Sequence, residues 1–256
     1  MDEVTRKLQR EAERIAARHP LPEFYSRFRA PAALARKLFF RHPTLSILRR
    51  DLQPFLHDEL GHGLYHSTRV SIDTATLVCV ELLYQGKIAR DRVERLMVLG
   101  IAAGMLHDIR RNEEEHARLG AEEAARVLKR YSLGCREIQC VCAAIRNHEA
   151  FTTPTAGGPE WFELISDCLY DADKFRWGPD TFVHTLWHMV SQQGLSPRDL
   201  IARFPWGMTG LARISETFRT GTGRQYGPGI IDTGAEIGKE IYQYLRRHYQ
   251  GDSNGQ

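Results

Sequence analysis

The feature that most constrains this fold is an apolar run of eleven residues, Leu96–Leu106, that ends directly in His107 and Asp108. The run is too short to cross a membrane, for which a helix needs about 20 apolar residues, so it predicts a helix buried on all sides. Burying a histidine and an aspartate at its end costs free energy unless both are hydrogen-bonded or bind a metal ion. The pair is therefore a candidate functional site.

Apolar residues recur at helical spacing along almost the whole chain, and the alternation typical of strands is not found in the sequence. The pattern predicts an all-α fold. We expect a first helix that carries Val4, Leu8 and Ile15 and a last helix that carries Ile237, Ile241 and Leu245. Between them we expect helices at about residues 66–83 with a stop near Gly86, 90–107, 114–131, 135–149, 160–175 and 180–191, and one that begins at Ser196, Pro197 and Asp199.

A glycine-rich stretch over residues 219–230, RTGTGRQYGPGI, breaks this periodicity. We interpret it as a loop, and a plain connection between two helices is the favoured reading. The alternative is a lid, in which Arg224 would hold a phosphate and Tyr226 would offer a ring to a base or sugar.

Charge and cysteine content exclude several classes of protein. The chain has 35 Lys+Arg against 32 Asp+Glu, and the net charge of +3 gives no strong nucleic-acid or membrane footprint. Five cysteines, an odd number scattered along the chain, fit a reducing compartment and give no disulfide framework. The N-terminus is charged and has no apolar segment of the secretory type, so we expect a cytoplasmic protein. The oligomeric state is left open.

Other polar residues accompany the His107-Asp108 pair. His66 lies in GHGLYHSTRV, where a preceding helix begins, and Asp171 lies in LYDADKF, near the end of a later helix. The resulting order, His, His-Asp, Asp, spans several predicted helices. A second pair, His57-Asp58, lies in a polar context and is expected on the surface.

Two further histidines are expected to face the same region. His148 follows Val141 and Ile145 at helical spacing, so it should point inward with them. His116 precedes a helix face of Ala117, Ala121 and Ala124, a pattern that favours close packing, and it could return toward the same pocket.

This order of residues resembles the HD superfamily of metal-dependent phosphohydrolases over about residues 56–180. The resemblance implies an HD-domain-like helical bundle with N-terminal and C-terminal helical extensions. Residues 1–55 would form a helical appendage, 56–180 the metal-binding core, and 181–250 helices that pack on this core.

The resemblance also implies a ligand set. His66, His107, Asp108 and Asp171 would bind one ion, and His116 and His148 fall where two-metal members bind a second. Imidazole and carboxylate ligands suit Mn, Fe, Co, Ni or Zn, and Asp108 is the natural bridge between two ions. Asp173 projects from another side of its helix than Asp171, which favours a salt bridge or cap for Asp173.

The implied activity is hydrolysis of a small phosphoester, above all a nucleotide, by a metal-activated water, with His107 and Asp108 as catalytic residues. Near these residues, Arg69, Arg110 and Lys174 could hold phosphate oxygens. The chain lacks the HHE and GYP motifs of the cyclic-dinucleotide branch, and it has Arg111-Asn112 where guanosine-tetraphosphate hydrolases have Glu-Asp. Two alternatives stay open: a di-iron oxygenase and a non-catalytic nucleotide-binding or signalling domain.

Overall fold

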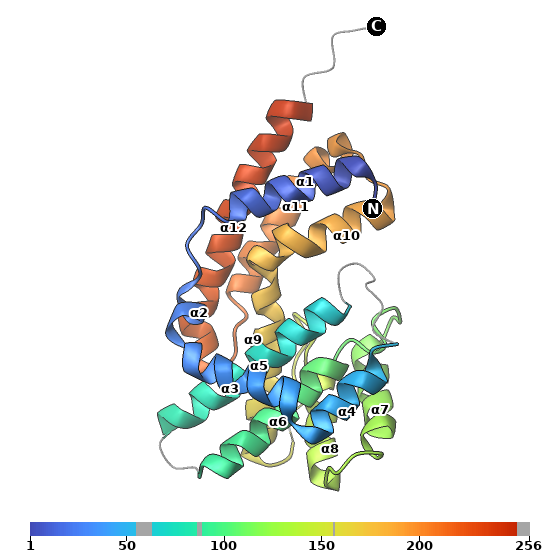
Figure 1. Cartoon of the computed structure of the whole chain (residues 1–256), viewed down its shortest axis with the longest axis vertical. Coiled ribbons are helices and arrows are strands. Elements are labelled where there is room, and N and C mark those ends of the chain that lie inside the picture. Colours follow the sequence, from blue (N-terminus) through green and yellow to red (C-terminus); the bar gives the residue numbers. More distant parts are fainter. Residues whose placement is uncertain (55–62, 86–88, 156, 250–256) are drawn as a thin grey trace, which may run out of the picture.

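The computed structural model describes residues 1–54, 63–85, 89–155 and 157–249. These residues form helices and connecting segments, with no strand among them (Figure 1). In chain order the helices are α1 (Glu3–Ala16), α2 (Glu23–Arg27), α3 (Arg29–Arg41), α4 (Pro43–Leu52), α5 (Leu64–Gln85), α6 (Arg90–Leu106), α7 (His116–Leu128), α8 (Cys135–Arg146), α9 (Glu160–Lys174), the 3-10 helix η1 (Phe175–Trp177), the π-helix η2 (Thr181–Thr185), α10 (Leu186–Gln193), α11 (Pro197–Ser215) and α12 (Gly221–Tyr249).

The apolar run forms the predicted buried helix, α6, in which every residue from Leu96 to Leu106 is buried. Helix α5 packs along it at very close range. A Cβ atom added to Gly104 would lie 2.6 Å from the Cα of Ser71, and one added to Gly100 would lie 3.1 Å from a methyl group of Thr74. The glycines therefore set the separation of the two helices, and this separation brings the start of α5 to the end of α6.

The first and last parts of the sequence pack together. Helix α1 packs against η2, α10 and α12 at one end of the molecule, and α12 runs from there toward the other helices (Figure 1). Leu8 and Ile15 of α1 belong to the same apolar core as Leu99 of α6 and Ile237 of α12. The first helix is therefore held to the rest of the fold through this common core.

Most of the predicted helices are confirmed to within a few residues. Gly194 ends α10 in a left-handed conformation, φ 60°, as its place after the helix predicts. Ser196, Pro197 and Asp199 form a capping box with proline in the first turn of α11. The expected stop near Gly86 and the pair His57-Asp58 lie outside the described residues.

The predicted loop at 219–230 is wrong, because residues from Gly221 onward form the first third of α12. Thr220 caps this helix: its hydroxyl accepts a hydrogen bond from the Gly223 amide at 2.7 Å, while Glu81 of α5 accepts one from the Thr222 amide at 2.7 Å. The glycines let the helix backbone lie close to neighbouring groups, and they do not form a flexible loop. Cβ atoms at Gly223 and Gly227 would meet the Asp171 carboxylate at 2.0 Å and the Phe218 ring at 2.3 Å.

Of the helices described here, none combines the length and apolar character that a membrane crossing requires.

Candidate metal centre

Two groups of side chains with metal-ligand chemistry meet where α5, α6 and α9 converge. The first group consists of His66 on α5, His107 directly after α6, and Asp173 on α9. The Nε2 atoms of the two histidines lie 3.1 Å apart, and Oδ1 of Asp173 lies 3.2 Å from Nε2 of His66 and 3.8 Å from Nε2 of His107. Both histidines are buried. One ion could be held by these three atoms.

The second group consists of Asp108, His116 at the start of α7, and His148 shortly after α8. Oδ1 of Asp108 lies 3.6 Å from Nε2 of His148, and the rings of His116 and His148 have centroids 5.2 Å apart. The other oxygen of Asp108, Oδ2, faces the first group, 3.3 Å from Nε2 of His107. Asp108 therefore offers one oxygen to each group, the arrangement expected of a bridging carboxylate.

Polar contacts at Nδ1 orient three of the histidines. Nδ1 of His107 donates to the Gly104 carbonyl at 2.9 Å, and Nδ1 of His148 donates to the Ile145 carbonyl at 2.6 Å. His116 directs Nδ1 at the Glu149 carboxylate, 3.2 Å away. Because these oxygens only accept, the proton of each neutral ring lies on Nδ1 and the lone pair of Nε2 points into the centre. Histidines that bind metal ions usually have their other ring nitrogen hydrogen-bonded in this way.

His148 gives a direct test of whether the residues fit a metal ion. Its Nε2 atom is buried and has no hydrogen-bond partner in the structure. A buried polar atom of this kind costs free energy unless something binds it. With two carboxylates and four imidazoles gathered around this position, a divalent cation fits the donor set.

The carboxylates alter the pKa values of the histidines. Burial lowers the pKa of His107, but the charges of Asp108 and Asp173 outweigh it and raise that pKa above its ordinary value. At His116, burial and the nearby His148 and Arg111 lower the pKa. The centre therefore attracts positive charge most strongly at the first group.

Lys174 connects the two groups. Its buried ammonium donates to Oδ2 of Asp173 at 2.5 Å and to the backbone carbonyl of His148 at 3.0 Å. Burial raises the pKa of Asp173, but Lys174 and the histidines His66 and His107 outweigh it and hold that pKa well below its ordinary range. Lys174 thus positions two of the candidate ligands, and it does not have the exposed ammonium expected of a phosphate-binding residue.

Asp171, expected from the resemblance to bind metal, lies in neither group, whereas Asp173 lies in the first. The buried Asp171 carboxylate accepts hydrogen bonds from the amides of Arg219 and Thr220, both at 2.8 Å, and from the Thr220 hydroxyl at 2.7 Å. Burial, its largest influence, raises the pKa of Asp171 to about 6. Asp171 binds the segment that begins α12, and Asp173 faces the histidines.

The other expected phosphate-binding residues have partners elsewhere. Arg69 pairs with Asp180, 3.4 Å from Nε to Oδ2, and Arg110 pairs with Glu113. Arg224 lies on α12, where it donates to the Arg219 carbonyl.

Sequence reasoning missed Arg111, whose Nη1 atom lies 3.1 Å from Nε2 of His116. The available signal was its place in HDIRR, three residues after Asp108. The adjacent Arg110 has nearly the same spacing, so the sequence does not distinguish the two arginines.

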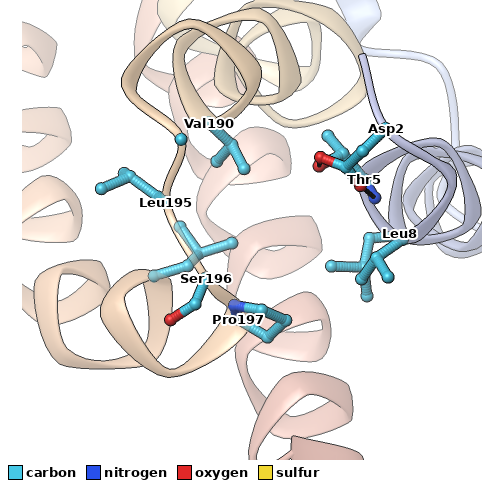
Figure 2. A pocket seen from close by; sticks show the side chains of 10 residues that line it. Asp2, Thr5, Leu8, Val190, Leu195, Ser196 and Pro197 are labelled. Atoms are coloured by element: carbon cyan, nitrogen blue, oxygen red, sulfur yellow. Dashed lines mark hydrogen bonds between the residues drawn. The ribbon is translucent and has the colours of Figure 1, made fainter.

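A hollow of about 270 Å³ lies elsewhere, between the start of α1 and the turn from α10 to α11 (Figure 2). Its polar groups already serve as helix caps: Asp2 accepts from the Thr5 amide and Ser196 accepts from the Asp199 amide. The rest of its lining is largely apolar, so this hollow adds no candidate ligand.

Comparison of the chain with known protein families, with curated proteins and with solved structures found no match. The all-helical fold and the two His/Asp groups are compatible with the HD pattern.

Proposed function

We propose that this protein is a metal-dependent phosphohydrolase of the HD type. The observation that carries the proposal is the inward orientation of the Nε2 lone pairs of His107, His116 and His148, set by polar contacts at Nδ1, toward two carboxylates. Core histidines that serve only packing have no need of this shared orientation.

The first ion would be held by His66, His107 and Asp173, and the second by His116 and His148, with Asp108 donating one oxygen to each. When bound, ions of the Mn, Fe, Co, Ni or Zn class supply Lewis-acid polarisation of phosphoryl oxygens and a lowered pKa for water. The protein's own contribution is to fix the ligands: Gly104, Ile145 and Glu149 hold the imidazoles, and Lys174 holds Asp173.

A cation beside the centre supports a small anionic substrate, and the residue next to His66 carries a partly exposed aromatic ring. The side chain of Arg111 is 39% exposed and reaches the second group, so its guanidinium borders the centre and solvent. Tyr65, the neighbour of His66, leaves its ring partly exposed and stacks on His184 with centroids 4.4 Å apart. A guanidinium suits a phosphate and an exposed ring suits a base, which favours a nucleotide among small phosphoesters.

Metal analysis of the purified protein, combined with phosphate release from a panel of nucleotides and simple phosphoesters, tests the proposal. We expect bound transition metal and metal-dependent release in the wild type, and loss of both in Asp173→Ala. Asp232→Ala, which removes an exposed carboxylate on α12, is the matched control and should change neither. Bound metal without release from any substrate would favour a non-catalytic domain, and iron with oxygen consumption would favour the oxygenase.

A further inference from the structure

We infer that Arg111 occupies the place of the second metal ion and must leave before that ion binds. This inference rests on the proposed function, because it concerns the second group of the same centre. In the structure, Nη1 of Arg111 lies 3.1 Å from Nε2 of His116 and 3.7 Å from Oδ1 of Asp108. The two atoms belong to two of the three residues of the second group.

Arg111 and a metal ion compete for the same electron pair. A guanidinium can only donate hydrogen bonds, so its contact with Nε2 of His116 uses the lone pair that an ion would need. Its permanent positive charge also repels a divalent cation at this distance. Arg111 and the second ion therefore exclude one another.

The cation beside the first group is placed differently. Lys174 bonds Oδ2 of Asp173, whereas Oδ1 is the atom that faces His66 and His107. The first ion can therefore bind with Lys174 in place. This difference between the two cations predicts one tightly bound ion and one that is bound weakly.

Departure of Arg111 requires little rearrangement. Within the described part of the chain, its side chain contacts His116 and Asp108, and it is 39% exposed. It lies in the turns between α6 and α7, so its movement leaves both helices intact. Once displaced, the guanidinium remains beside the centre, where an anionic group can bind it. Before it is displaced, when only the first ion is bound, Arg111 supplies the positive charge at the second group.

Titration of the metal-stripped protein with Mn²⁺, followed by the spectroscopic signal of free Mn²⁺ and by calorimetry, tests the inference without an activity assay. We expect one tight and one weak ion in the wild type, and a second ion bound roughly tenfold or more tightly in Arg111→Gln. Arg111→Lys keeps the charge and should lie between the two. Arg110→Gln breaks only an exposed pair with Glu113 and is the matched control.

The outcomes separate this inference from the proposed function. An unchanged second affinity in Arg111→Gln, or two equally tight ions in the wild type, would overturn the role of Arg111 and leave the metal centre standing. No ion bound by any variant would overturn both. Arg111→Ala, with thermal unfolding measured alongside, repeats the test with a second side chain in case glutamine itself binds the ion. His116→Ala should lose the second ion and keep the first.

Discussion

Nε2 of His66 lies 3.1 Å from Nε2 of His107, although the two residues are 41 positions apart in the chain. Two imidazole nitrogens at this separation need a proton or a metal ion between them, because their lone pairs repel one another. The raised pKa of His107 shows that the surroundings favour positive charge at this point. A metal ion bound by this pair would depend directly on the packing of α5 on α6.

We expect bound metal to stabilise the fold and His107→Ala to remove that effect. At a free metal concentration about 100 times the dissociation constant, binding contributes about 2.7 kcal/mol, or about 5–10 °C in Tm for a chain of this size. Thermal unfolding with and without a chelator measures the difference. His248→Ala, at an exposed position on α12, is the control and should keep the full shift. A chelator without effect on the wild type would contradict the prediction.

The close contact of α5 with α6 predicts that Gly104→Ala weakens metal binding. Its new methyl group would lie 2.6 Å from the Cα of Ser71, so the helices must separate and His66 must move away from His107. In Gly100→Ala the atom nearest to the methyl group is a methyl of Thr74, at 3.1 Å, and a smaller effect is expected. Unfolding in urea should show a loss of about 2–3 kcal/mol for Gly104→Ala. Equal metal affinity in the two variants would count against this positioning role.

Lys174→Met should reduce metal affinity by about 10–100-fold, because it removes the group that holds Asp173 and the His148 carbonyl. Lys239→Met, which breaks an exposed pair with Glu236, provides the comparison. Metal affinity is measured by competition with a chromophoric chelator. Arginine at position 174 should not restore affinity, since its larger fork does not fit a buried ammonium position.

Asp171 predicts a specific pH dependence of stability. Its pKa rises from 3.8 unfolded to about 6 in the fold, so the native state holds a proton that the unfolded state has lost between these values. The stability from this group is complete below about pH 4 and is lost as pH rises through about 6, a change of about 3 kcal/mol. Asp171→Asn has no such titration. Denaturant unfolding of both proteins at pH 4 and pH 7, in the presence of a chelator, measures this difference. From pH 4 to pH 7 the free energy of unfolding should fall more in the wild type than in Asp171→Asn.

Two glycines of α12 should respond in opposite ways to alanine. A methyl group at position 223 would meet the Asp171 carboxylate at 2.0 Å, and Gly223→Ala should cost about 3 kcal/mol. Gly229 is exposed and has open space around it, so Gly229→Ala should stabilise the helix by about 0.5–1 kcal/mol. Chemical denaturation of both variants measures the contrast. Similar effects would mean that the helix does not approach Asp171 as described.

The helices and most candidate ligands could be predicted because buried faces leave a periodic pattern in the sequence. The histidines stood out as polar residues on apolar faces, and His148 beside Ile145 is the clearest case. The start of α12 was missed because glycine and Pro228 lower local helix propensity, whereas capping by Thr220 and Glu81 and close packing favour the helix. Glycines at 223, 227, 234 and 238, spaced for one helix face, were the signal available.

The choice between Asp171 and Asp173 could not be made from the sequence. The two residues lie about 200° apart around α9, so only one of them can face the histidines. Which one does so depends on which neighbour covers each face. Both carboxylates are buried and both accept hydrogen bonds, Asp173 from Lys174 and Asp171 from the Thr220 amide. Burial and hydrogen bonding therefore do not distinguish them.

The hydrogen bonds of Asp171 also set an order of events during synthesis of the chain. A ribosome completes the first group of ligands when it adds Asp173, but the amides that satisfy the Asp171 carboxylate come from residues 48 and 49 positions later. Until then α9 cannot be buried at Asp171 without an unmatched polar group. We therefore expect nascent chains that end before Arg219 to hold metal poorly, and chains that extend through α12 to hold it firmly.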